Sequence, residues 1–166
     1  VMSNLDDIDD IIQDLNSWQA SLGLLNNSDR IEHLIAQGES DKLEFKSTLS
    51  LDIKSQTKEK YIETSVLRTI VGFLNSRGGT LLIGVSDDGT ISGLSEELKL
   101  FHKEKLDHLL KHFLNIIKAR IGEDFYDFIS YKAIKIQGKI IIEVSTKAIK
   151  HGNGCFLDEE DFIVRQ

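Results

Sequence analysis

Residues 38–46, GESDKLEFK, carry the pattern of a short core strand with charged side chains along one side. Alternate residues of a strand share a face. Leu43 and Phe45 therefore point one way, and Glu44 and Lys46 point the other. The pattern predicts a strand over residues 42–47 with a carboxylate and an ammonium group as neighbours on one face.

A second carboxylate, Glu39, lies five residues before Glu44. This odd spacing would place the two side chains on opposite faces if the strand ran straight. We therefore expect a bend near Gly38 or Ser40 that brings Glu39 and Glu44 together.

The segment after this strand contains the strongest helix pattern of the chain. Residues 48–58 are polar without periodicity and predict a mobile loop. Apolar residues then recur at helical spacing from residue 58 to residue 76 and predict a helix. Its apolar stripe consists of Ile62, Val66, Leu67, Ile70, Val71 and Leu74, and the pair Gly78 and Gly79 ends the pattern.

The next segment predicts a buried strand followed by a turn. The run TLLIGVS, residues 80–86, is apolar on both sides, as expected of a central buried strand. Asp87, Asp88 and Gly89 predict a tight turn, with a short return over residues 91–94.

The C-terminal half predicts one more helix and a hairpin. Apolar spacing favours an amphipathic helix over residues 102–121, and alternation predicts strands over 128–136 and 139–145 around Gln137-Gly138. A last short strand, residues 161–165, runs into the chain end, so we expect the natural protein to continue past Gln166. Helices and strands without a regular βαβ rhythm favour an α+β domain, a mixed sheet packed by two amphipathic helices.

The N-terminus has the pattern of a helical appendage. Apolar residues at helical spacing predict an amphipathic helix over residues 5–20, with acidic residues crowding its first turns. A linker over 23–27 and a second helix over 29–37, capped by Ser28 and closed by Gly38, follow. We assign residues 1–27 to an appendage for packing or dimerisation, and residues 28–166 to the main domain.

Composition excludes several classes of protein. A chain of 166 residues can bury a core without disulfides, and its single cysteine, Cys155, rules out an intramolecular disulfide framework. No apolar run approaches the roughly 20 residues of a membrane helix. We expect a cytoplasmic protein.

The net charge of -7 argues against a nucleic-acid binder, but its distribution weakens that argument. Residues 1–45 contain ten Asp and Glu against Arg30 and Lys42, a balance of -8, so residues 46–166 sum to +1. A local basic face is compatible with this balance. We expect phosphate contacts from the following basic residues: Lys46, Lys54, Lys58, Lys60 and Arg77.

Three sequence segments together resemble the Schlafen AlbA-type domain, once labelled a divergent AAA domain. They are GESDKLEFK at 38–46, TIVGFLNSRGGTLLIGVSDDGTISGL at 69–94 and DFIVR at 161–165. The resemblance spans residues 37–165 and is most specific in its centre. It implies an α+β fold and, in the nuclease members, a metal-dependent endoribonuclease that cuts transfer and ribosomal RNA.

The resemblance also implies site residues. The family's three catalytic acids fall on Glu39, Glu44 and Asp87, which would hold Mg²⁺ or Mn²⁺ beside a phosphodiester while Lys46 contacts the phosphate. The zinc site of eukaryotic members is not carried over, because His151 and Cys155 are too few ligands. Those members surround RNA with two related lobes, so this one-lobed chain would need to pair with a second copy.

Ordinary structural roles stand beside these assignments. Glu39 after a helix-ending glycine is typical of a solvated residue, and Asp87 and Asp88 are typical of a turn. His102, His108 and His112 lie on or near one helix, where we expect them to face solvent, and each lysine alone is typical of a solvated surface.

The sequence is compatible with three functions. The first is a metal-dependent endoribonuclease acting on structured RNA such as tRNA. The second is a non-catalytic DNA- or RNA-binding or regulatory module of a larger protein, and the third, weaker one is ATP binding. No Walker sequence with its Lys-Ser/Thr supports the third.

Overall fold

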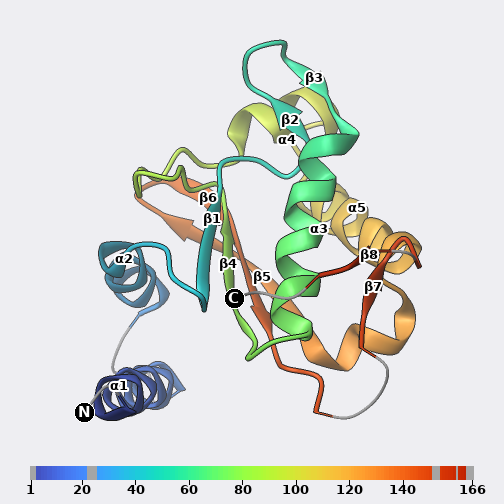
Figure 1. The fold of residues 1–166 in the computed structure, drawn as a ribbon. Coiled ribbons are helices and arrows are strands. Elements are labelled where there is room, and N and C mark those ends of the chain that lie inside the picture. Colours follow the sequence, from blue (N-terminus) through green and yellow to red (C-terminus); the bar gives the residue numbers. More distant parts are fainter. Residues whose placement is uncertain (1–2, 22–25, 151–153, 160, 164–166) are drawn as a thin grey trace. The chain divides into compact units, whose positions relative to one another are not determined.

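The computed structural model describes residues 3–21, 26–150, 154–159 and 161–163 (Figure 1). Its elements, in chain order, are α1 (Ser3–Ser21), α2 (Asn27–Gln37), β1 (Leu43–Lys46), β2 (Leu51–Asp52), β3 (Thr57–Lys58), α3 (Lys60–Leu74), β4 (Gly79–Ile83), α4 (Ser95–Phe101), α5 (Leu106–Arg120), the 3₁₀ helix η1 (Glu123–Phe128), β5 (Ile129–Ile136), β6 (Lys139–Thr146), β7 (Phe156–Leu157) and β8 (Asp161–Phe162). The chain forms two compact units, residues 1–37 and 38–166. The boundary predicted at residue 27 lies earlier, so α2 groups with α1.

The N-terminal unit consists of the two predicted helices. α1 presents an apolar stripe whose described members are exposed: Ile8, Ile11, Ile12, Leu15 and Trp18. The cap of α2 differs from the prediction, because Asn26, not Ser28, accepts the Asp29 backbone N–H through Oδ1 at 2.8 Å. An asparagine oxygen satisfies a free helical donor as well as a serine does. The proposed role of this unit in dimerisation stays a prediction.

The larger unit is built on a four-stranded mixed sheet in the order β1-β4-β6-β5. β1 and β4 pair in parallel and are joined through α3, whereas β4–β6 and β6–β5 are antiparallel (Figure 1). Sheet and helices together confirm the α+β class.

The alternation predicted for β1 is confirmed by its register. Glu44 lies beside Leu81 of β4 and Lys46 beside Ile83, so both charged residues share the sheet face of these two core residues. Phe45 points to the opposite face and is buried.

The main core lies on the sheet face that carries Leu81 and Ile83. The amphipathic stripes of α3 and α5 supply Val66, Leu67, Leu109 and Phe113 to this core, and β6 supplies Ile142 and Val144. Each of these residues is at least nine-tenths buried. Packing by two amphipathic helices is thus as predicted.

The hairpin of β5 and β6 also follows the prediction. Gln137 and Gly138 both have positive φ, 51° and 73°, as a two-residue loop of type I′ requires. Eight residue pairs hold the two strands in register.

The predicted mobile loop over residues 48–58 is wrong. β2 and β3 pair there as a short hairpin, and Glu59 N donates to Ser50 O at 2.8 Å to close it. Strands of two residues are too short to show an alternation in sequence.

The single helix predicted over 102–121 is also wrong. α4 ends at Phe101 and α5 begins at Leu106, because Lys103 and Glu104 adopt left-handed φ of 52° and 59° between them. A right-handed helix cannot pass through two such residues.

The C-terminal strand prediction is confirmed at its start. Asp161 and Phe162 form β8, which pairs with β7, while residues 164 and 165 lie outside the described part. The Asn75 side chain after α3 fixes this hairpin, since Nδ2 donates to Cys155 O and Ile163 O, both at 2.8 Å. Among the described residues, no helix has the length and apolarity needed to cross a bilayer.

Candidate functional site

The expected bend before β1 is present and brings Glu39 to the strand. Gly38 has a φ of +77°, and Ser40 N donates to Leu43 O at 2.8 Å, which turns the chain. Glu39 Oε1 then accepts the Phe45 backbone N–H at 2.8 Å. Glu39 therefore completes the hydrogen bonding of an edge strand, a structural role that its spacing alone did not indicate.

Glu44 and Lys46 form an ion pair on the helix-covered face of β1. Lys46 Nζ lies 3.3 Å from Glu44 Oε1, and the two side chains are 26% and 20% exposed. Partial burial and the shared strand face restrict both side chains. The ammonium group that could meet a phosphate is thus already beside a carboxylate.

Asp87 lies in the turn that follows β4. Asp88 is the turn-forming acid, because its Oδ1 accepts Thr90 N at 2.9 Å, and this backbone hydrogen bond lowers the pKa of Asp88. Asp87 is exposed. The assignment of Asp87 as a site residue stays a prediction.

The ends of β1 and β4 are held together next to Asp87. Gly84 N and Val85 N both donate to Lys46 O, at 2.7 and 3.2 Å, and Ser47 Oγ lies 3.4 Å from Ser86 Oγ. Asp87 thus follows directly on a segment that contacts the carboxyl end of β1, the strand that carries Glu44.

Whether these acids could hold a dication depends on which groups their carboxylate oxygens already contact. Carboxylate oxygens suit Mg²⁺ and Mn²⁺. However, Glu39 and Glu44 each direct an oxygen at a protein donor. No group of three or more His, Cys, Asp or Glu among the described residues could hold a metal. The described residues thus contain no ready three-ligand group, and the metal role of the three acids stays a prediction.

The expected phosphate contacts fall into separate places. Lys54, Lys58 and Lys60 are exposed in the β2–β3 hairpin and the start of α3. Arg77 follows the other end of α3, which is about 22 Å away for a helix of 15 residues. The three lysines lie close together along the chain, whereas Arg77 lies apart from them, and its phosphate contact stays a prediction.

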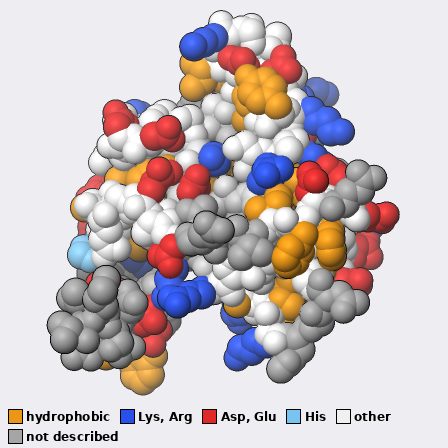
Figure 2. Space-filling view, in the orientation of Figure 1, with side chains coloured by type: hydrophobic (Ala, Val, Ile, Leu, Met, Phe, Trp, Pro, Cys, Tyr) orange, Lys and Arg blue, Asp and Glu red, His pale blue; other side chains and the backbone are white. Residues whose placement is uncertain are grey.

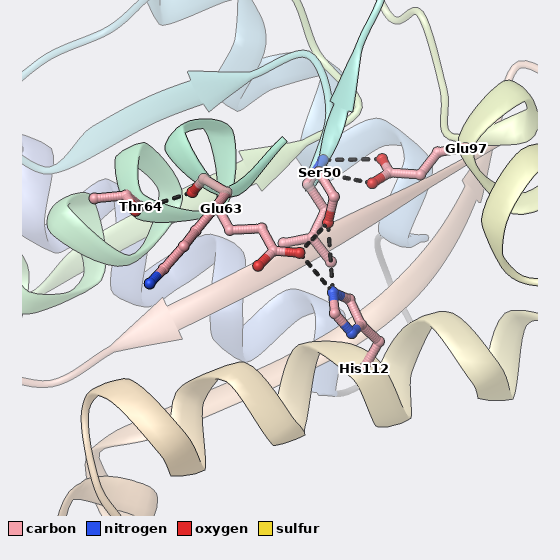
Figure 3. Close-up of polar contacts among 7 residues, drawn as sticks. Ser50, Glu63, Thr64, Glu97 and His112 are labelled. Atoms are coloured by element: carbon pink, nitrogen blue, oxygen red, sulfur yellow. Dashed lines mark hydrogen bonds and ion pairs between the residues drawn. The ribbon is translucent and has the colours of Figure 1, made fainter. Parts of the chain in front are cut away.

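A buried polar cluster that the sequence patterns did not predict lies beneath this hairpin (Figure 3). Glu63 Oε1 on α3 accepts hydrogen bonds from Ser50 Oγ and from His112 Nε2 on α5, both at 2.7 Å. Burial raises the pKa of Glu63, but the hydrogen bonds from His112 and Ser50 outweigh it and leave that pKa below its usual value. Glu63 is thus held as a carboxylate inside the fold.

Glu97 of α4 completes the cluster from the opposite side of Ser50 (Figure 3). Its two carboxylate oxygens accept the backbone N–H groups of Leu49 and Ser50, at 2.9 and 2.6 Å. Glu97 is only 1% exposed, and burial raises its pKa despite these hydrogen bonds. The side chain fixes the turn between β1 and β2.

The prediction that the three helix histidines face solvent is wrong for two of them. His102 is 4% exposed, and its Nε2 has no hydrogen-bond partner among the described residues. Burial, with the nearby His112, lowers the pKa of His102 to about 4. His112 is partly buried against Glu63, and only His108 is exposed.

The cluster does not have the geometry of a serine nucleophile relay. Such a relay places the serine and the acid on different imidazole nitrogens. Here Glu63 lies 2.7 Å and Ser50 3.5 Å from the same atom, His112 Nε2, and Ser50 is fully buried. The cluster instead joins the β1–β2 turn to α3, α4 and α5.

Cys155 has no reactive character. It is buried, and burial raises the pKa of its thiol to about 11. His151 lies outside the described residues.

Comparison with known proteins identifies the family. No curated protein matches the chain. The family model described as Schlafen, AlbA_2 matches residues 39–166, which begins at Glu39 and covers nearly the whole larger unit. The match supports a nucleic-acid-related function. This chain therefore belongs to the Schlafen AlbA_2 family.

Proposed function

We propose that this protein binds RNA, and that the β2–β3 hairpin with the start of α3 provides its main phosphate contacts. The observation that carries the proposal is the exposure of Lys54, Lys58 and Lys60 within seven residues of one another. Among the residues that the structure describes, none of the three is in an ion pair within 4.0 Å. Their charges remain available to a phosphate backbone.

The acids of the same segment, Asp52 and Glu59, are partly exposed and accept local hydrogen bonds. Asp52 accepts hydrogen bonds from the Tyr61 hydroxyl and from backbone N–H groups of its own turn. Glu59 Oε1 accepts the Thr57 hydroxyl at 2.9 Å. The strong negative charge of residues 1–45 belongs mostly to the other compact unit.

Binding is tested by fluorescence anisotropy with a labelled RNA hairpin that has a single-stranded loop. Saturable binding that weakens steeply as salt rises is expected, because each neutralised phosphate releases counterions. A variant with Lys99→Gln, Lys103→Gln and Lys111→Gln changes charge equally at exposed positions elsewhere and serves as the control. Absence of measurable binding at low salt would overturn the proposal.

A second candidate is a divalent-metal-dependent endoribonuclease of Schlafen type. It is favoured by the acids at the edge and carboxyl end of β1: Glu39 bonded at Phe45, Glu44 on the strand, and Asp87 after the segment that contacts Lys46. Each of the two glutamates uses one carboxylate oxygen for its present partner, so the other oxygen could take part in holding a metal ion.

Cleavage is tested separately from binding. Wild-type protein is incubated with the RNA hairpin in Mg²⁺, in Mn²⁺ and in excess chelator, beside Glu44→Gln and the exposed-acid control Glu96→Gln. Endoribonuclease activity requires cleavage that both chelator and Glu44→Gln abolish while Glu96→Gln retains it. Binding without cleavage in either metal would leave the RNA-binding module as the function.

A further inference from the structure

Two large apolar side chains are exposed at the end of the unit that carries the three lysines. Tyr61, in the first turn of α3, is 61% exposed, and Ile53, directly after β2, is 58% exposed. In Figure 2 hydrophobic, basic and acidic side chains occur together at the projecting end that Figure 1 labels β2 and β3. Neither side chain is part of the buried core, so packing does not explain why it is apolar.

The Tyr61 side chain is anchored through its hydroxyl group. Its hydroxyl donates to Asp52 Oδ2 at 2.7 Å, while Asp52 Oδ1 accepts Lys54 N at 2.8 Å and Ser55 N at 3.3 Å. Gln56 Nε2 donates to Ile53 O at 2.9 Å within the same turn. The ring is thereby positioned through its hydroxyl, and its large exposed fraction is left to the aromatic surface.

The phenol is also kept neutral. A tyrosine is neutral near neutral pH in any case, and the hydrogen bond to the Asp52 carboxylate raises the pKa of Tyr61 further. Proteins bind unpaired nucleotides with bases stacked on aromatic rings and phosphates on nearby cations. The three lysines lie within seven residues of Tyr61 in the sequence, together with the acids Asp52 and Glu59. Duplex RNA offers no free base face to such a ring.

We infer that Tyr61 is a stacking platform for an unpaired RNA base, with Lys54, Lys58 and Lys60 positioned to contact the adjoining phosphates. This inference rests on the proposed RNA binding and adds a ligand class to it: single-stranded nucleotides in loops or ends, not duplex. Ile53 forms an apolar side of the same site. A protein or a second copy as the occupant would use apolar surface without needing an aromatic ring.

The test compares the dissociation constants of a single-stranded RNA oligonucleotide and of the corresponding blunt duplex, measured by anisotropy with the full chain. Four variants are used: Tyr61→Ala, Tyr61→Leu, Tyr61→Phe and, as a control for an exposed ring in the β7–β8 hairpin, Phe162→Ala. Thermal unfolding of each variant checks the fold. Tyr61→Phe keeps the ring and loses only the hydroxyl.

We expect Tyr61→Ala and Tyr61→Leu to weaken single-strand binding about 10-fold, as loss of one base stack does. Duplex binding should change less than about 2-fold, and Phe162→Ala should stay near wild type. Tyr61→Phe keeps the ring but loses its anchoring hydroxyl, so it should lose clearly less affinity than Tyr61→Ala. Wild-type affinity in Tyr61→Leu would indicate an apolar contact and overturn the inference, as would an equal loss in Tyr61→Phe. If the wild type binds neither RNA, both the proposed function and this inference fail; if it binds and Tyr61→Ala binds equally, only the inference fails.

Discussion

Glu63 of α3 and His112 of α5 meet inside the domain, with 2.7 Å between Oε1 and Nε2. Because a carboxylate only accepts hydrogen bonds, His112 presents its Nε2–H to Glu63. The contact joins the two helices that cover the sheet, directly beneath the hairpin that we assign to RNA. The β2–β3 hairpin is thus supported by the buried polar cluster as well as by the apolar core.

Loss of the histidine should destabilise the domain. His112→Leu leaves the Glu63 carboxylate buried with only Ser50 as a hydrogen-bonding side chain, and we expect about 2 kcal/mol less free energy of unfolding at neutral pH. Urea unfolding monitored by circular dichroism measures the change. His108→Leu, an exposed histidine of the same helix, should stay within about 0.5 kcal/mol of wild type. Equal effects of the two substitutions would show that the buried contact adds no stability.

Stability should also fall on mild acidification because of His102. Its pKa is about 4 in the folded protein against 6.5 for the ordinary side chain, so the unfolded chain binds the additional proton first. The stability present above pH 6.5 is therefore lost progressively as the pH falls to about 4, by roughly 3 kcal/mol in total. The neighbouring carboxylates contribute in opposite directions: as the pH falls, the lowered pKa of Glu63 costs stability and the raised pKa of Glu97 adds stability.

His102→Leu isolates this effect. The variant should show a flatter dependence of unfolding free energy on pH between 6.5 and 4.5 than the wild type, whereas the exposed His108→Leu should keep the wild-type slope. Urea titrations at several pH values give both slopes. An unchanged slope in His102→Leu would assign the acid sensitivity to another group.

Glu97 should contribute far more to the free energy of unfolding than its sequence neighbour Glu96. Glu97→Ala leaves the N–H groups of Leu49 and Ser50 without their acceptors, and we expect a loss of about 2–4 kcal/mol. Glu96→Ala, an exposed change one residue earlier, should cost less than about 0.5 kcal/mol. Urea midpoints of the two variants test the difference, and similar midpoints would refute the structural role of Glu97.

Local patterns in the sequence predicted the elements whose signals are local. The alternation of Leu43, Glu44, Phe45 and Lys46 correctly predicted the two faces of β1, because strand periodicity is independent of distant contacts. The glycine after Gln137 correctly predicted the β5–β6 turn. The apolar stripe over residues 58–76 likewise correctly predicted helix α3.

The polar cluster could not be predicted in the same way. Ser50, Glu63, Glu97 and His112 come from four separate segments, and each looks like an ordinary surface residue in its own segment. Only the packing of α4 and α5 near the β1–β2 turn brings them together. The sequence likewise gave no sign that the Glu39 carboxylate would accept the Phe45 N–H.

The most direct test of the account is the salt dependence of RNA binding by a variant with Lys54→Gln, Lys58→Gln and Lys60→Gln. Removal of three phosphate contacts should flatten the plot of log binding constant against log salt by about 2, at about 0.7 per contact for single-stranded RNA. The control with Lys99→Gln, Lys103→Gln and Lys111→Gln should keep the wild-type slope. Equal slopes for wild type and the hairpin variant would contradict the assignment of this surface to RNA.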